Sequence, residues 1–271
     1  MKKLVFELLY CILFTSINLY AFEANTTSNT QEVAKQLQNP VASLISVPLQ
    51  NNFEYGLGQD KKGSRYTLKI QPVIPTSMSE NWNIIFRPII PIVAQHSVLD
   101  HSSQSGLSDL QLQIFFSPKK VEEGNIIWGI GPVLLLPTAT NNLLGSQKWG
   151  IGPSGVVLTQ KGPWTMGLLA NHILSFAGNQ YRKNISLTYL QPFLAHSNTK
   201  GLSFNLSSET SYDWKDGNWT IPIIGGASQI VPIYGQLISF GLSGICYVKR
   251  PSFDPQWGIR ANITFLFPNK N

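Results

Sequence analysis

A histidine and a serine two positions apart, His101 and Ser103, are the residues whose types and spacing come closest to catalytic chemistry. In an extended strand, side chains at positions i and i+2 point to the same side, so the two groups would meet. The histidine could then take the hydroxyl proton while the serine attacked an ester, provided that a third polar group oriented the imidazole. The pair raises the alternative of a lipid esterase; we favour the other interpretation, a solvated loop.

The His-x-Ser spacing resembles that of outer-membrane phospholipase A, whose fold is also a barrel of twelve strands. In that family an asparagine follows within the next strand. Here the corresponding stretch, Leu110–Gln113, contains only leucine and glutamine. The resemblance lacks one polar member of the catalytic group, and we expect the protein not to be an enzyme.

No cluster of metal ligands and no phosphate-binding glycine loop occurs in the sequence, so we expect neither a metal nor a cofactor. Only 13% of the residues are charged, about half the share of an ordinary soluble domain. The net charge is +6, but the lysines and arginines are scattered singly, which argues against a nucleic-acid partner. The four histidines are far apart: His96, His101, His172 and His196.

The N-terminus has the layout of a secretory signal peptide, with two lysines, an apolar stretch and a cut expected after Ala21. Residues 1–21 are therefore the predicted signal peptide. Residues 22–42 are polar and are predicted to form a periplasmic tether or plug, with a short helix at Gln31–Gln38 that stops before a proline. The remainder, 43–271, is the predicted barrel.

From residue 43 onward, apolar and polar residues alternate with a period of two, which is typical of strands with one oily and one polar face. The clearest example is 202–214. The pattern predicts an all-β fold, an antiparallel barrel of about twelve strands. The stretches are 43–58, 64–75, 82–97, 107–117, 126–138, 149–160, 164–177, 184–197, 201–214, 218–230, 236–249 and 256–267.

All seven tryptophans fall at the ends of these predicted strands. Strand parity places three at one rim and four at the other, as in the aromatic girdles of a transmembrane β-barrel. In hydrocarbon every backbone polar group must be paired, so strands can cross a membrane only as a closed barrel. We predict a barrel in the outer membrane of a Gram-negative bacterium, with outer-membrane lipid and the barrel-assembly machinery as partners. The three tryptophans predicted at one rim are Trp82, Trp128 and Trp164, and the four predicted at the other rim are Trp149, Trp214, Trp219 and Trp257.

Seven charged residues lie opposite the oily face of their strands and are predicted to line the lumen. Charges of both signs inside a barrel either line an aqueous path or pair to close it, and the sequence leaves both interpretations open. The seven are Glu54, Lys69, Arg87, Asp109, Glu209, Asp213 and Arg260.

Two features interrupt the alternation. Prolines fall inside several predicted strands, and because proline removes a ladder donor we expect bulges or open corners there. His172 falls on the apolar face of its strand, where we expect a bulge or a register shift rather than a ligand.

Several short motifs resemble those of a family of bacterial outer-membrane proteins that are labelled as transporters and sometimes as neuromedin U. The family is similar to the proteins of the meta-pathway of phenol degradation group. The resemblance implies an outer-membrane β-barrel with a transport role, and it brings no catalytic residues. A Gly-x-Gly-Asp motif of the wider group is Gly106-Leu107-Ser108-Asp109 here, without the second glycine. The motifs are 38–52, Gln71–Pro75, Leu136–Thr140, Gly145–Gly150, Ala170–His172 and Thr264–Pro268.

The predicted function is a passive channel or transporter for a small-molecule solute, with hydrophobic or aromatic molecules among the candidates. Two alternatives of other classes stay open. One is a barrel-embedded lipid esterase that uses His101 and Ser103, and the other is a closed structural or adhesive barrel.

Overall fold

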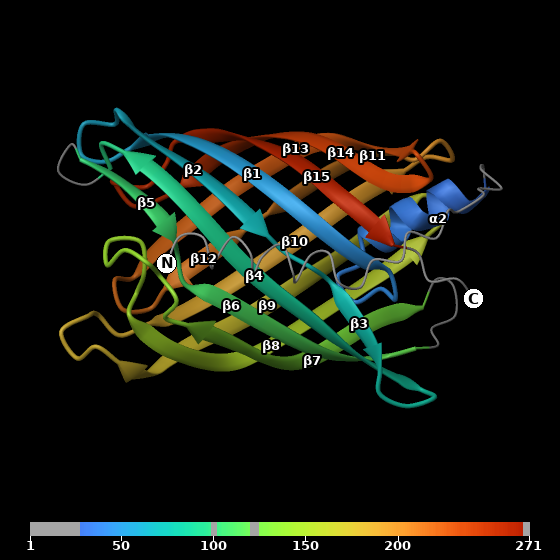
Figure 1. Cartoon of the computed structure of the whole chain (residues 1–271), viewed down its shortest axis with the longest axis horizontal. Coiled ribbons are helices and arrows are strands. Elements are labelled where there is room, and N and C mark those ends of the chain that lie inside the picture. The colour runs from blue at the N-terminus through green and yellow to red at the C-terminus, as the bar shows by residue number, and fades with distance from the viewer. Residues whose placement is uncertain (1–27, 99–101, 120–124, 268–271) are drawn as a thin grey trace.

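Fifteen β-strands form one antiparallel sheet that closes on itself, because the first strand pairs with the last (Figure 1). β1 (Ile45–Leu57) and β15 (Trp257–Phe267) pair in continuous register. The structure is a computed structural model that describes residues 28–98, 102–119 and 125–267. The predicted signal peptide, 1–21, lies outside the described residues.

The other elements follow along the chain. They are α2 (Ser28–Leu37), β2 (Gly63–Ile70), β3 (Ile74–Ser77), β4 (Trp82–His96), β5 (Ser103–Leu107), β6 (Leu110–Pro118), β7 (Ile126–Leu136), β8 (Lys148–Lys161), β9 (Trp164–Gly178), β10 (Ser186–Ser197), β11 (Leu202–Ser208), β12 (Thr210–Asp213), β13 (Asn218–Ile233) and β14 (Gln236–Lys249).

Twelve strands cross the barrel, because three crossings are each built from two consecutive pieces: β2 with β3, β5 with β6, and β11 with β12. Both pieces of a crossing pair with the same neighbour; β4, for example, pairs with β5 and with β6. The prediction of an all-β, twelve-stranded antiparallel barrel is confirmed.

Several strand prolines coincide with interruptions of the sheet. Pro72 lies between β2 and β3. Pro192 lies between the part of β10 that pairs with β12 and the part that pairs with β11, and Pro222 lies at a register shift between β13 and β14. Pro132 and Pro153 face each other across β7 and β8. A proline has no N–H to donate to the ladder. The closed sheet therefore accommodates these prolines where strand pairing is interrupted, or, for Pro132 and Pro153, directly opposite each other.

The two rims of the barrel differ. One rim, called here the helix rim, holds α2 together with the start of β1 and the end of β15 (Figure 1). Its connections include two-residue turns at 162–163 and 234–235. The opposite rim, called here the loop rim, carries longer connections, of which 137–147 is the longest. Both ends of the barrel sheet therefore meet at the helix rim, as an even number of crossings requires.

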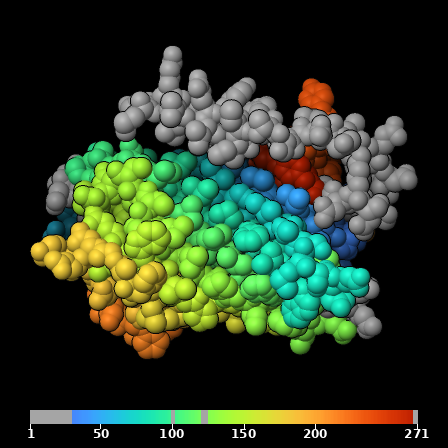
Figure 2. Space-filling view, turned by 60° about the horizontal axis from the view of Figure 1, so that its bottom comes forward, coloured from blue at the N-terminus to red at the C-terminus, as the bar shows by residue number. Residues whose placement is uncertain are grey.

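The outer wall of the barrel is apolar over most of its height. Side chains alternate between the two faces of each strand, and the outward set is rich in exposed leucine, isoleucine, valine and phenylalanine. Figure 2 shows part of this wall, over the strands coloured cyan to yellow. Large exposed apolar surfaces mark sites of contact with a membrane or with another protein. Examples of exposed outward residues are Ile130, Ile151, Leu168, Phe204, Leu242 and Ile259.

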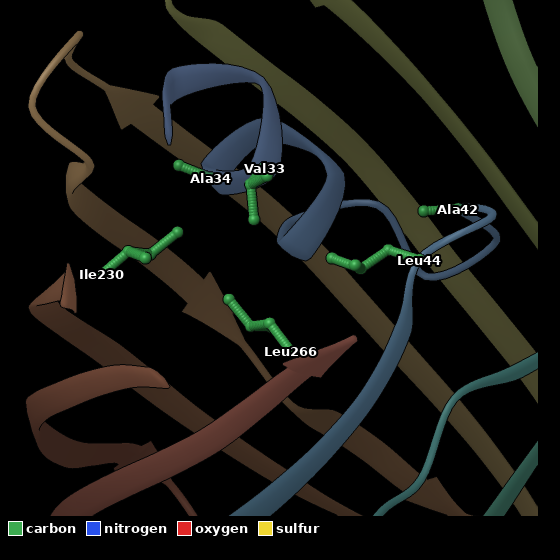
Figure 3. Packing of buried hydrophobic residues seen from close by; sticks show 6 residues of the cluster. All are labelled: Val33, Ala34, Ala42, Leu44, Ile230 and Leu266. Atoms are coloured by element: carbon green, nitrogen blue, oxygen red, sulfur yellow. The ribbon is translucent and has the colours of Figure 1, made fainter. Parts of the chain in front are cut away.

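Helix α2 lies inside the mouth of the barrel at the helix rim. The residues after it are Gln38, Asn39 and Pro40, and a proline disfavours helical backbone in the residue before it. Its buried face packs Val33 and Ala34 against inward side chains of β13 and β15 (Figure 3). Within the described part of the chain, no helix has the length and apolarity needed to cross a bilayer.

The interior is divided between an apolar side and a polar side. Strands β4 and β6 to β9 contribute a packed apolar cluster, which Val41 also joins. The inward side chains of β1, β2 and β15 are mostly polar or charged. The apolar cluster contains Ile85, Phe115, Val156, Leu158 and Leu169.

Candidate functional site: the barrel lumen

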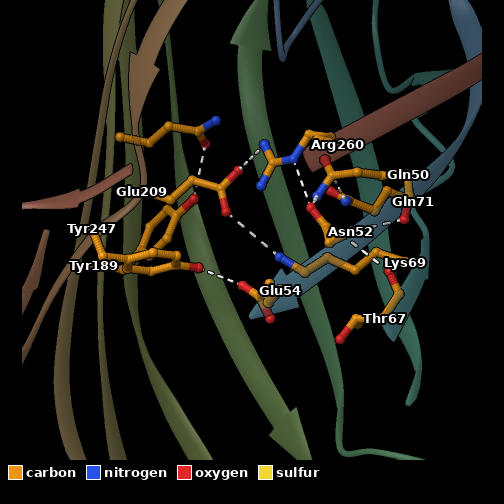
Figure 4. Close-up of polar contacts among 11 residues, drawn as sticks. Gln50, Asn52, Glu54, Thr67, Lys69, Gln71, Tyr189, Glu209, Tyr247 and Arg260 are labelled. Atoms are coloured by element: carbon orange, nitrogen blue, oxygen red, sulfur yellow. Dashed lines mark hydrogen bonds and ion pairs between the residues drawn. The ribbon is translucent and has the colours of Figure 1, made fainter. Parts of the chain in front are cut away.

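Four side chains from across the lumen form an ionic group, called here the lumen network: Asn52, Lys69, Glu209 and Arg260 (Figure 4). Arg260 Nη1 lies 2.6 Å from Glu209 Oε1, and Lys69 Nζ lies 3.5 Å from Glu209 Oε2. Arg260 Nε donates to Asn52 Oδ1 at 2.7 Å. The carboxylate is therefore shared by two cations, and the arginine by two acceptors.

Sheet register places these groups. Arg260 of β15 lies directly opposite Asn52 of β1, and Asn52 lies opposite Thr67 of β2. Lys69 follows two residues after Thr67 and therefore shares its inward face. Glu209 comes from the opposite side of the lumen, at the break between β11 and β12. β1 must pair with β15 before Asn52 and Lys69 can join Glu209 and Arg260 in one group.

Uncharged polar groups extend the lumen network along the polar side (Figure 4). Asn52 Nδ2 donates to the Thr67 carbonyl at 3.2 Å, and Gln50 Nε2 donates to Asn52 Oδ1 at 3.3 Å. Towards the loop rim, the Tyr247 hydroxyl donates to the Glu54 carboxylate. Each of these side chains thus has at least one partner, as partly buried polar groups require.

The lumen network separates two cavities. A cavity of ≈ 130 Å³ on the loop-rim side is lined by Glu54 and Tyr247 among others. A cavity of ≈ 260 Å³ on the helix-rim side reaches residues 36–40 and is called here the helix-side cavity. Arg260 lines both. The arrangement offers fixed charges and hydrogen-bond groups to a solute inside the barrel.

Five of the seven charged residues expected in the lumen lie on its inner face: Glu54, Lys69, Arg87, Glu209 and Arg260. Arg87 Nη1 donates to Gln113 Oε1 at 3.0 Å. The other two, Asp109 and Asp213, lie at the loop rim, where each binds a connection between strands. Their position differs from the expected one because both stand at strand ends, where the chain leaves the barrel wall.

Asp109 fastens the loop 137–147 to the junction of β5 and β6. Its carboxylate accepts hydrogen bonds from the Ser146 backbone N–H at 2.6 Å, from the Ser146 hydroxyl at 2.6 Å and from the Ala139 N–H at 3.3 Å. Gly145 must be small here, because a Cβ on it would lie 2.6 Å from Asp109 Oδ1. Arg182 secures the same loop by donating to the carbonyls of Asn142 and Gly145.

Asp109→Ala is expected to loosen this loop without unfolding the barrel. Hydrogen bonds to a charged group contribute about 1.5–3 kcal/mol each, so the free energy of local opening should fall by at least about that amount. Hydrogen exchange of the amides in 138–147, followed by mass spectrometry, measures the change. Asp254→Ala is the matched control. Asp254 lies in a different loop, between β14 and β15, and its carboxylate accepts a hydrogen bond from the Thr220 hydroxyl of β13. Equal exchange in both variants would show that Asp109 does not hold 137–147.

Asp213 pairs with Lys183 of the neighbouring loop 179–185, with Lys183 Nζ 2.8 Å from Asp213 Oδ2. Lys183 also pairs with Asp216. Partial desolvation of Lys183 acts to lower the pKa of its ammonium group, but hydrogen bonds to the two carboxylates outweigh it, so the pKa is raised. The pair is exposed, and such surface pairs contribute little to stability.

The catalytic alternative rested on His101 and Ser103. His101 lies outside the described residues. The Ser103 hydroxyl lies 2.8 Å from Nδ1 of a different histidine, His96, which faces it directly across β4 and β5. Within the described residues, no acidic or amide side chain is hydrogen-bonded to His96. The group that would orient the imidazole is therefore not in place in the described structure.

The tryptophans occupy both rims. Trp82, Trp128 and Trp164 lie at the strand ends of the helix rim, and Trp82 contacts Trp128 edge to face with ring centroids 5.7 Å apart. Trp149, Trp214, Trp219 and Trp257 lie at the loop rim.

His172 does not cause the irregularity that was expected. The register between β9 and β10 is unbroken at His172, which lies opposite Thr188. His172 Nδ1 lies 2.8 Å from Thr188 Oγ1, and Trp214 Nε1 donates to the same oxygen at 2.8 Å. The prediction of a bulge or register shift at this residue is wrong, because a hydroxyl on the neighbouring strand satisfies the imidazole on the outer face.

Sequence reasoning missed the uncharged members of the lumen site, among them Gln50, Asn52 and Tyr247. A signal was present for two of them, because Gln50, Asn52 and Glu54 alternate with outward residues along β1. Charge alone identifies only part of the inner face, because amide side chains are equally able to hydrogen-bond in a polar lumen. Among the described residues, no group of three His, Cys, Asp or Glu side chains could hold a metal ion.

No protein-family model and no curated protein matches this sequence. Among solved structures, the barrel is similar to the COG4313 outer membrane channel from Pseudomonas putida F1, with 14% sequence identity and a TM-score of 0.64. The match covers 83% of this chain and 94% of the channel. A NanC porin structure aligns at 10% identity over 82% of this chain and 100% of the porin, with a TM-score of 0.49. The chain thus has the fold of an outer-membrane channel.

Proposed function

We infer that this protein is a passive channel for small molecules in the outer membrane of a Gram-negative bacterium. The observation that carries the proposal is the contrast between the two faces of a closed barrel. Its exterior is apolar, and one side of its interior holds charges of both signs beside cavities. Such a wall is suited to hydrocarbon outside and to a polar solute path inside.

Further features support this placement. The tryptophans at both rims fit two aromatic girdles at the water interfaces of a bilayer. Outer-membrane lipid would contact the apolar wall, and the barrel-assembly machinery would insert it. The resemblance to outer-membrane proteins labelled as transporters agrees with this function. Apolar side chains that line the helix-side cavity, among them Leu37, Leu44 and Phe193, favour solutes with a hydrophobic or aromatic part.

Helix α2 is proposed to restrict the channel at the helix rim. Ala34→Glu would place a carboxylate among Ile230 and Leu266, where Ala34 is fully buried. An unpaired charge costs several kcal/mol to bury, so the helix should leave the mouth. The expected result is a larger single-channel conductance in planar lipid bilayers. Glu32→Gln, on the exposed part of the same helix, is the control and should conduct like the unmodified protein.

The same bilayers test the alternatives. Ser103→Ala should leave the current unchanged, since Ser103 lies on the outer face. Loss of lipid-ester hydrolysis on Ser103→Ala would instead support the esterase. A protein that neither conducts nor hydrolyses lipid, even as the Ala34→Glu variant, would overturn the channel and leave a structural or adhesive barrel.

A further inference from the structure

The helix-side cavity has an unbalanced charge. Two arginines, Arg87 and Arg260, line it, and no aspartate or glutamate of the described part of the chain is among its lining residues. Arg260 is already paired with Glu209, which lines only the smaller cavity on the other side of the lumen network. The excess positive charge of the helix-side cavity therefore comes from Arg87.

Arg87 has no counter-ion among the described residues. Within residues 28–98, 102–119 and 125–267, the Arg87 side chain has one hydrogen-bond partner, the amide oxygen of Gln113, and its buried Nε has none. A guanidinium group held away from bulk water is costly unless it is paired, and the five N–H donors of arginine fit a carboxylate in a bidentate manner. The cavity thus has an unmet requirement for an anion.

Two amide oxygens of the same cavity also lack partners. Asn205 Oδ1 and Asn262 Oδ1 are buried, and neither accepts a hydrogen bond from any residue that the structure describes. Buried polar atoms without partners are rare, and they mark places where a ligand or water completes the bonding. A solute with a hydroxyl or amide donor beside its anionic group would satisfy them.

The rest of the lining limits the size and character of such a solute. The cavity measures ≈ 260 Å³, which is many times the space needed for one water molecule. Leu37, Leu44, Val73 and Phe193 line it together with the polar groups. It therefore offers a charged group, amide groups and an apolar surface within one enclosure, as ligand sites commonly do.

We propose that the helix-side cavity is a binding subsite for a small organic carboxylate with a compact apolar body, and that Arg87 is its counter-ion. The carboxylate pairs with the guanidinium group, and the apolar body lies against the leucines, Val73 and Phe193. Asn205 and Asn262 accept hydrogen bonds from donors on the solute. This proposal rests on the channel function in one respect, since the solute reaches the cavity through the lumen.

Isothermal titration calorimetry of the full mature protein in detergent tests the subsite, with benzoate as the probe and the neutral benzamide as its comparison. One benzoate should bind per barrel, and benzamide should bind about 10- to 100-fold more weakly, because the charge-assisted pair is lost. Arg87→Gln should weaken benzoate binding by a similar factor. Asn262→Asp, which adds a carboxylate to the cavity at nearly the same size, should also weaken it.

Arg65→Gln is the matched control. Arg65 also donates to a glutamine, Gln95, at 3.0 Å, but it does not line the helix-side cavity. Its replacement should leave the benzoate affinity unchanged. Equal affinity for benzoate and benzamide, equal losses in the Arg65 and Arg87 variants, or no benzoate binding to the unmodified protein would each overturn the subsite.

Bilayer currents in potassium chloride separate this proposal from the channel function. Currents without benzoate binding would remove the subsite and leave the channel. Benzoate binding without currents, in the unmodified protein and in Ala34→Glu, would keep the subsite and remove the channel.

Discussion

Leu242→Arg is expected to lower the free energy of unfolding by about 2–4 kcal/mol, the cost of arginine on the lipid face near the middle of a bilayer. Leu242 lies at the centre of β14, between Ala227 and Ala261, and its side chain is 63% exposed on the outer wall. If hydrocarbon covers this wall, the guanidinium group must leave water. Urea unfolding of the protein in phospholipid vesicles measures the change.

Val248→Arg is the control on the same strand. Val248 is also exposed, but it lies one residue from the end of β14 at the loop rim. The cost there should be only about 0–1 kcal/mol, since charged side chains near the interface reach water. Similar costs at both positions would contradict a membrane around the barrel, because a water-exposed wall would not distinguish the middle of a strand from its end.

Glu209→Gln is expected to destabilise the protein by about 3–5 kcal/mol, the range for removing one partner of a buried ion pair. The side chains of Arg260 and Glu209 are 10% and 16% exposed. Glutamine keeps the shape of Glu209 but removes the carboxylate that pairs with both Arg260 and Lys69. The same urea unfolding in vesicles gives the free energy, and reversal potentials in bilayers should shift towards anion selectivity.

A double variant separates the charge from the contacts. Adding Arg260→Gln to Glu209→Gln removes the isolated guanidinium group, so part of the lost stability should return. A cost below about 1 kcal/mol for Glu209→Gln alone would resemble an exposed pair and would mean that water fills the lumen at this level.

Period-two alternation was sufficient to predict the barrel crossings. The stretch 236–249 coincides with β14, and 164–177 differs from β9 by one residue. Alternation predicts these strands because most of them have an apolar outer face and a more polar inner face. It is weakest on β4, where Ile85 and Ile89 face inward between outward apolar residues, so the sequence is apolar on both faces. A strand buried on both sides gives no alternation to detect.

The candidate site could be predicted only in part, because periodicity assigns a residue to a face but not to a partner. Glu209 and Arg260 were both expected in the lumen, yet their ion pair depends on how two distant strands face each other across it. Asp109 was placed by strand parity, while its actual position depends on the fold of a loop. For residues 22–42 the sequence left a tether and a plug open, because the choice depends on whether the buried face of α2, with Val33 and Ala34, finds apolar side chains on distant strands.

Pairing of β1 with β15 has a consequence for how the molecule is made. Asn52 and Arg260, which bond across this seam, are 208 positions apart. Contacts so distant along the chain form late, and topologies that depend on them assemble slowly. Until β15 arrives, both margins of the growing sheet carry bare N–H and C=O groups, which can template pairing with other chains. Closure of the seam between β1 and β15 therefore competes with aggregation during assembly. The outcome depends on how soon β15 pairs with β1.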